Sequence, residues 1–151
     1  IKNNPSSRRL MVSAWAPQDM KDMALPPCHY AFQIYINNGK LDLMWMQRSV
    51  DTFLGLPYDI AMYGLLLEML AKGADLIPGE LIGQFGDCHL YNNHLEQAKL
   101  YLSRPNRALP QLELESGIYL DEFLYIPLAD EIKLINYNPY AAIKAELSVG
   151  K

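Results

Sequence analysis

Cysteine, long hydrophobic runs and excess positive charge are scarce in this sequence, and each scarcity excludes a class of protein. Two cysteines, Cys28 and Cys88, are too few for a disulfide framework, so we expect a reducing compartment, the cytoplasm. The longest apolar stretch, residues 60–70, is shorter than the roughly 18 residues that cross a bilayer and contains Glu68, which excludes membrane insertion. The formal net charge is -4 and no basic stripe extends beyond Arg8-Arg9, so nucleic acid is not expected as the main partner.

The overall composition of the chain is typical of one soluble domain. Half of the 151 residues are hydrophobic and a fifth are charged. A chain of this length buries roughly 68–70% of the surface that its unfolded form exposes. We therefore expect residues 1–151 to form a single domain. The chain opens on Ile1 with no initiator Met and no signal-peptide pattern, so we expect it to be cut from a longer polypeptide.

Strands and helices are both predicted from the spacing of apolar residues. A helix is predicted over residues 59–72, and its apolar side chains lie nearly all round it, which indicates burial at the centre of the fold. The other predicted elements are strands over 9–15, 29–36, 40–48, 81–85, 112–114 and 133–136, a helical turn over 18–23, a helix over 93–104 and irregular chain over 115–131. The expected fold class is α+β, with a mixed or antiparallel sheet and a buried central helix.

The dipeptide Asn38-Gly39 predicts a tight hairpin between residues 29–36 and 40–48. Both central residues of a type I′ turn need positive φ, which Asn and Gly adopt readily. A two-residue turn at this position places Cys28 opposite Ser49 and beside Arg48. A bulge would shift the pairing by one residue and leave the neighbourhood intact. A cysteine and a cation are therefore expected to meet in space.

Cys28 is the first candidate for chemistry. It follows two prolines and opens a predicted strand, a stiff platform for a sulfur atom. The thiolate is the reactive form of cysteine, and a nearby cation such as Arg48 favours it. A single cysteine is more often a small buried hydrophobe. That is the expectation for Cys88, which has no predicted cation beside it.

Two pairs of residues are suited to binding a phosphate. Arg8-Arg9 and Arg48-Ser49 combine guanidinium groups, which can donate two parallel hydrogen bonds to phosphate oxygens, with a hydroxyl donor. The alternative for Arg8-Arg9 is a solvated strand end.

Other polar residues allow two interpretations each. His89 and Tyr91 lie on the same side of an extended segment, where they would bind a sugar hydroxyl or form an ordinary polar pair. Neither His89 nor His94 has the companions that a metal site needs, so no metal is expected. Asp59 stands just before an apolar helix, either as its N-cap or as a buried carboxyl that must find a partner, since an unpaired one costs several kcal/mol.

Several long blocks of the sequence resemble one enzyme family. They are residues 4–9 (NPSSRR), 25–29 (LPPCH), 47–51 (QRSVD), 53–58 (FLGLPY), 86–94 (GDCHLYNNH) and 137–140 (YNPY). In this order the blocks resemble thymidylate synthase and its sister enzymes, the deoxypyrimidine hydroxymethylases, over essentially the whole chain. The resemblance implies a thymidylate synthase-like fold.

The resemblance also implies a reaction. Cys28 would add to C6 of a deoxypyrimidine 5′-monophosphate, so that C5 takes a one-carbon unit from the co-substrate 5,10-methylenetetrahydrofolate. Arg48 would activate the thiol and, with Ser49, hold the 5′-phosphate, while His89 and Tyr91 would bind the deoxyribose hydroxyl. The residues expected to face the folate are Asp51, Leu54, Gly55 and Tyr58. In this family the counterparts of Arg8 and Arg9 reach the phosphate of the partner subunit, so an obligate homodimer with shared sites is expected.

Asp59 departs from the synthase pattern, which has an asparagine that reads O4 and N3–H of uracil. A carboxyl suits cytosine better, because it accepts from the N4 amino group and, when protonated, donates to N3. A proton offered at N3 also stabilises the charge that develops when a nucleophile attacks C6. Asp in place of this Asn is what cytidylate hydroxymethylases of the family look like. The sequence therefore favours deoxycytidylate (dCMP).

Three hypotheses follow. The first is a dCMP hydroxymethylase such as those used to make modified phage DNA, acting in the cytoplasm of the host if phage-encoded. The second is a thymidylate synthase that converts dUMP to dTMP. The third is an inactive nucleotide-binding or dimerisation fragment, because the family's catalytic glutamate and folate-facing tryptophans belong to an N-terminal part that precedes the matching blocks. On this last ground we expect residues 1–151 alone to turn over little or nothing.

Overall fold

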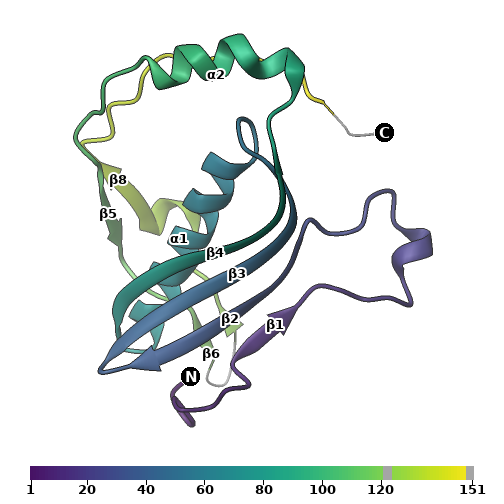
Figure 1. The fold of residues 1–151 in the computed structure, drawn as a ribbon. Coiled ribbons are helices and arrows are strands. Elements are labelled where there is room, and N and C mark those ends of the chain that lie inside the picture. The colour runs from purple at the N-terminus through teal and green to yellow at the C-terminus, as the bar shows by residue number, and fades with distance from the viewer. Residues whose placement is uncertain (121–123, 149–151) are drawn as a thin grey trace.

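A computed structural model describes residues 1–120 and 124–148, and its main layer is a four-stranded sheet in the order β1-β2-β3-β4. These strands are β1 (Met11–Ser13), β2 (His29–Asn37), β3 (Lys40–Asp51) and β4 (Ile77–His89). β2 pairs antiparallel with β1 and β3, whereas β3 pairs parallel with β4. The helix α1 (Leu56–Gly73) connects β3 to β4, and Figure 1 shows the strands passing in front of it. The predicted α+β class with a mixed sheet is confirmed.

Smaller elements follow the sheet along the chain. The helix α2 (Leu95–Leu102) comes directly after the 3-10 turn η2 (Asn92–His94). Two two-stranded sheets pair β5 (Gln111–Leu114) with β8 (Ile132–Ile135), and β6 (Tyr119–Leu120) with β7 (Leu124–Tyr125). The remaining 3-10 turns are η1 (Met20–Asp22) and η3 (Ala129–Glu131). Within residues 1–120 and 124–148, no helix is long and apolar enough to cross a membrane.

Several predicted bounds differ from the structure. The strand expected over 9–15 is only Met11–Ser13, and the turn expected over 18–23 is a three-residue 3-10 helix. β4 extends well beyond the expected 81–85, because it pairs with β3 along its whole length. The part of residues 115–131 that the structure describes contains the β6-β7 hairpin and η3 rather than irregular chain alone.

The hairpin turn has the geometry that Asn38-Gly39 predicts. Asn38 and Gly39 have φ values of 50° and 76°, and Asn37 pairs with Lys40. The predicted register holds from the turn as far as the Ala31–Met46 pair. A bulge between His29 and Ala31 then shifts it by one residue, so the expected Cys28–Ser49 pairing is wrong. Cys28 instead lies opposite Arg48, whose backbone N–H donates to the Cys28 carbonyl oxygen at 2.9 Å.

The core forms where one face of the sheet packs on α1. Alternate residues of β3, Leu41, Leu43 and Trp45, are buried against Tyr63 and Leu67 of the helix. This pattern of burial arises because every second side chain of a strand points to the same face, and because residues three or four apart in α1 lie on one side of the helix.

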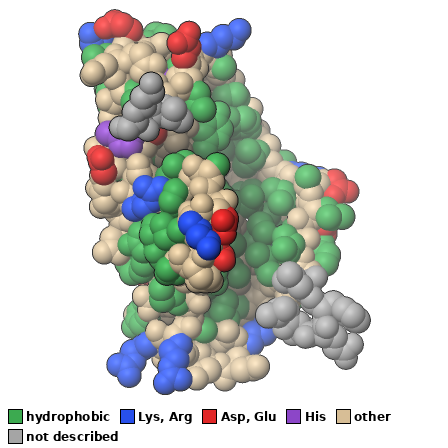
Figure 2. Space-filling view, turned by 90° about the vertical axis from the view of Figure 1, so that its right-hand side faces the viewer, with side chains coloured by type: hydrophobic (Ala, Val, Ile, Leu, Met, Phe, Trp, Pro, Cys, Tyr) green, Lys and Arg blue, Asp and Glu red, His purple; other side chains and the backbone are tan. Residues whose placement is uncertain are grey.

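The side of α1 that points away from the main sheet is exposed along the first half of the helix. Tyr58, Ile60 and Met62 are 76%, 47% and 50% exposed. The helix is therefore buried by the main sheet on one face and by residues 117–118 near its C-terminal end, and not all round. Figure 2 shows hydrophobic side chains over much of one face of the molecule.

Tyr63 is the aromatic centre of this core. Its ring stacks on Trp45 at a centroid distance of 5.1 Å and on His29 at 5.6 Å. Tyr63 is only 6% exposed. Burial raises the pKa of its phenol above the usual 10.0, and the negative charge of Asp59 raises that pKa further.

The raised pKa of Tyr63 predicts a loss of stability in alkali. Above pH 10.0 the folded chain keeps the phenol proton that the unfolded chain releases, so the free energy of unfolding falls as the pH rises through the pKa of the folded state. In urea titrations at pH values from neutral to above 10, Tyr63→Phe should show a shallower alkaline decline than the wild type. Tyr35→Phe, at an exposed position, should decline like the wild type. Equal slopes for Tyr63→Phe and the wild type would contradict this account.

Candidate active site

The predicted site residues gather at one end of the main sheet. β3 and β4 run parallel and end together, with Ser49 opposite Asp87 and Asp51 opposite His89. Cys28 immediately precedes β2 at the same end, and the first turn of α1 starts close by. Ligands of open sheets with parallel strands bind outside the carboxyl ends of those strands. The topology therefore places these residues where a ligand site is expected.

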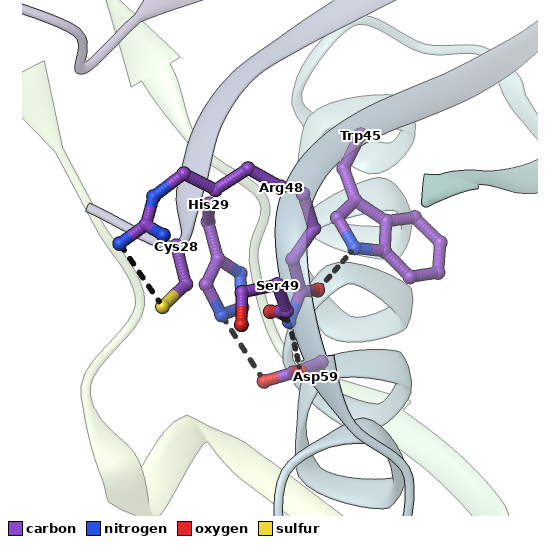
Figure 3. Close-up of polar contacts among 7 residues, drawn as sticks. Cys28, His29, Trp45, Arg48, Ser49 and Asp59 are labelled. Atoms are coloured by element: carbon purple, nitrogen blue, oxygen red, sulfur yellow. Dashed lines mark hydrogen bonds and ion pairs between the residues drawn. The ribbon is translucent and has the colours of Figure 1, made fainter. Parts of the chain in front are cut away.

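The sulfur of Cys28 lies beside a fixed guanidinium group. Arg48 Nη2 is 3.9 Å from Cys28 Sγ (Figure 3). The same guanidinium donates from Nη2 to the Pro26 carbonyl oxygen at 2.7 Å and from Nε to the Pro27 carbonyl oxygen at 3.0 Å. The Pro26-Pro27 segment thus holds the cation against the cysteine that follows it. Cys28 is a free, partly exposed thiol, so the cysteine and cation predicted to be neighbours do meet.

Asp59 is not the N-cap of α1. The helix begins at Leu56 with Gly55 as N-cap and Pro57 in the first turn, where its fixed φ suits a helix start. The Asp59 N–H already donates to the Gly55 carbonyl oxygen at 3.0 Å. The N-cap interpretation is therefore wrong. The carboxyl group instead points towards the end of the sheet and has partners there.

Two side chains hold the Asp59 carboxylate. His29 Nε2 lies 3.3 Å from Oδ1, and Gln47 Nε2 donates to Oδ2 at 2.9 Å (Figure 3). The side chains of His29 and Asp59 are 29% and 14% exposed. The interpretation of Asp59 as a buried carboxyl that finds partners agrees with this geometry.

His29, Gln47 and Trp45 were not predicted from the sequence as residues of this site. Gln47 also donates from Nε2 to the Ser49 carbonyl oxygen at 3.0 Å, and its Oε1 accepts from the Trp45 indole N–H at 3.1 Å. The sequence signal that could have found His29 and Gln47 is the hairpin, in which they lie opposite each other once the bulge has shifted the register.

His89 and Tyr91 lie together at the end of β4. Their rings meet edge to face at a centroid distance of 4.9 Å, and His89 Nδ1 is 3.6 Å from an oxygen of Asp87. The His89 carbonyl oxygen accepts from the N–H and the hydroxyl of Thr52, each at 2.9 Å. These bonds tie the end of β4 to the segment after β3, and so bring the predicted sugar-binding pair to the same end of the sheet as Cys28.

The predicted folate-facing residues occupy the segment between β3 and α1. Asp51 Oδ1 accepts from the N–H groups of Phe53 and Leu54 at 3.0 and 3.2 Å, so this carboxylate holds its own loop. A Cβ at Gly55 would lie 3.0 Å from the Asp51 carbonyl oxygen, a tight contact that glycine avoids. Leu54 and Tyr58 line a groove of about 830 Å³, whose other wall comes from residues 101–110 and 137–143.

Arg8 and Arg9 do not join this site within one chain. Both are exposed and precede β1, and the next residue, Leu10, accepts a hydrogen bond from Ile34 through its carbonyl oxygen. They therefore lie towards the turn end of β2, whereas Cys28 precedes the opposite end.

Cys88 differs from its prediction. It is exposed on β4, not buried, because β4 is an edge strand of the main sheet. In the part of the chain that the structure describes, no group of three or more His, Cys, Asp and Glu side chains could hold a metal ion.

Comparison with known protein families identifies the family of this chain. The family model described as thymidylate synthase matches residues 1–149, nearly the whole chain. The matched range includes every residue of the end-of-sheet site. This chain belongs to the thymidylate synthase family, which supports folate-dependent transfer of a one-carbon unit to a pyrimidine nucleotide.

Proposed function

We propose that this chain carries the nucleotide site of a deoxycytidylate hydroxymethylase. The Cys28 thiolate donates an electron pair to C6 of the pyrimidine, and the electron pair of the C5–C6 double bond then attacks the one-carbon unit supplied by 5,10-methylenetetrahydrofolate. Loss of the C5 proton then expels tetrahydrofolate and leaves an exocyclic methylene at C5, with Cys28 still bonded to C6. Water adds to that methylene, and expulsion of the Cys28 thiolate restores the C5–C6 double bond and gives the hydroxymethyl product. The 3.9 Å contact between Arg48 Nη2 and Cys28 Sγ supports the first step, because a cation favours the thiolate.

The neighbouring donors suit the rest of the nucleotide. A guanidinium has more N–H groups than the two that the Pro26 and Pro27 carbonyls use, so Arg48 retains donors for an anion. We assign the 5′-phosphate to Arg48 and Ser49, and the deoxyribose hydroxyl to His89 and Tyr91.

The observation that carries the choice of base is the environment of Asp59. Gln47 donates to Oδ2, so Oδ1 is the oxygen left to face a ligand, next to His29. That oxygen can accept from the N4 amino group of cytosine and, when protonated, donate to N3. Uracil presents O4 and N3–H instead, and an ionised carboxylate facing O4 has no donor to offer. The site therefore suits dCMP better than dUMP.

We also propose that two copies of the chain share their sites. On the face of the sheet that points away from α1, Met11, Tyr35 and Ile82 are 53%, 62% and 41% exposed. An uncovered apolar face of this kind favours a partner. A second copy would bring its own Arg8 and Arg9, which do not join the site of their own chain, to the phosphate. The folate would lie against Asp51, Leu54, Gly55 and Tyr58.

A cysteine substitution tests the covalent step. In the full-length protein, Cys28→Ser should abolish the covalent adduct with 5-fluoro-dCMP and methylenetetrahydrofolate, because a hydroxyl is a far weaker nucleophile than a thiolate. Binding of dCMP should stay within about threefold, since the phosphate and base contacts remain. Mass spectrometry of the intact protein reads the adduct. Cys88→Ser is the matched control and should form the adduct normally. An adduct on Cys28→Ser would refute the assignment.

A second substitution tests the choice of base. Asp59→Asn should move the preference from dCMP towards dUMP by about tenfold or more, because the amide supplies the donor that O4 needs. Calorimetric titration with each nucleotide measures this ratio, and release of the C5 hydrogen from dCMP and dUMP measures it in turnover. If wild-type protein already prefers dUMP by orders of magnitude, the proposed substrate is wrong.

Mixing two inactive variants tests the shared site. Arg8→Ala/Arg9→Ala and Cys28→Ser should each be inactive as homodimers. After mixing under exchange conditions, activity should return to about a quarter of wild type, because half of the dimers then hold one complete site. No recovery, despite proven exchange of subunits, would show that Arg8 and Arg9 do not act across the dimer.

A further inference from the structure

We propose that Trp45 is a positioning residue that sets the preference for cytosine, although it does not touch the nucleotide. Its indole N–H fixes the direction of the Gln47 amide, and that amide favours a proton of Asp59 on the oxygen that faces the ligand. The inference rests on the proposed dCMP site and adds a residue that controls its specificity.

The direction of the Gln47 amide follows from its partners. Gln47 is 3% exposed, so its polar atoms depend on neighbours inside the protein. The indole of Trp45 is a donor only, so the amide atom 3.1 Å from it must be the oxygen. The amide nitrogen then faces the Ser49 carbonyl oxygen and Asp59 Oδ2, both of which accept.

This direction controls the proton of Asp59. Because Gln47 donates to Oδ2 and an unprotonated oxygen is the better acceptor, a proton taken up by the carboxyl group is favoured on Oδ1. With neutral His29 carrying its ring proton on Nδ1, Oδ1 beside Nε2 can hold a proton and offer it to N3 of cytosine. A reversed amide would present its own oxygen to Oδ2 and draw the proton there. Oδ1 would then carry no proton to donate to N3 of cytosine, and the contact that favours cytosine over uracil would be lost.

The packing of Trp45 keeps its N–H in place. The indole is 3% exposed, stacks on Tyr63 with an interplanar angle of 17° and meets the edge of Phe85 at 5.2 Å. A phenylalanine at position 45 keeps an aromatic ring on Tyr63 and removes the donor, together with one ring of the indole. The Ser49 carbonyl still opposes a reversed amide, so the loss should be partial.

The test is calorimetric binding of dCMP and dUMP to Trp45→Phe in the full-length protein. We expect the preference for dCMP over dUMP to fall by about fivefold to tenfold, mainly through weaker dCMP binding, because one buried hydrogen bond is lost. Phe85→Leu is the matched control, since it loosens the packing of the indole but keeps its N–H. It should leave the ratio of the two affinities unchanged.

The outcomes separate this inference from the proposed function. If the wild type prefers dCMP and Asp59→Asn shifts that preference, but Trp45→Phe leaves the ratio unchanged, Trp45 has no role in specificity. If Trp45→Phe and Phe85→Leu each weaken the binding of dCMP and dUMP equally, Trp45 likewise has no role in specificity. A wild type without preference for dCMP overturns both proposals. Should Trp45→Phe fail to fold, site-specific benzothienylalanine at position 45, which keeps the indole shape without the N–H, gives the same test.

Discussion

The backbone pairing between the start of β2 and the end of β3 is the constraint on which the site depends. The bulge between His29 and Ala31 places Cys28 opposite Arg48 and His29 opposite Gln47. One shift of register therefore sets both the contact between sulfur and guanidinium and the network that holds Asp59. The carbonyls of Pro26 and Pro27 complete the arrangement by holding the Arg48 side chain. Backbone pairing and these side-chain contacts together hold the cysteine, the cation and the carboxyl group at one end of the sheet.

Much of this was predictable from sequence because the decisive signals are local. Asn38-Gly39 specifies the turn and most of the register, and the proximity of Cys28 and Arg48 follows from that register. The bulge depends on tertiary packing, so the exact partner of Cys28 was predicted wrongly. β4 was predicted too short, since its length depends on parallel pairing with a strand distant in sequence. The role of Asp59 was left open, because an N-cap and a buried carboxyl group cannot be told apart in sequence until the helix start at Leu56 is known.

The structure also adds residues that no single-residue pattern indicates. His29, Gln47 and Trp45 are ordinary members of two strands in sequence, yet they form a continuous set of polar contacts with Asp59. Indole and amide groups have fixed donors and acceptors, so the chain of contacts has a direction. In the proposed site, that direction orients the Asp59 carboxyl group for the recognition of cytosine. Specificity in this account is set inside the core as much as at the surface of the site.

The central claim is that the pyrimidine ring sits between the Cys28 sulfur and the Asp59 carboxyl group. A crystal structure of the full-length protein with dCMP tests it most directly. The account predicts C6 of the base in contact with, or bonded to, Cys28 Sγ, and N3 or N4 within hydrogen-bond distance of Asp59 Oδ1. A cytosine ring bound elsewhere, for example in the groove beside Tyr58, with Cys28 and Asp59 touching no part of the base, would contradict it.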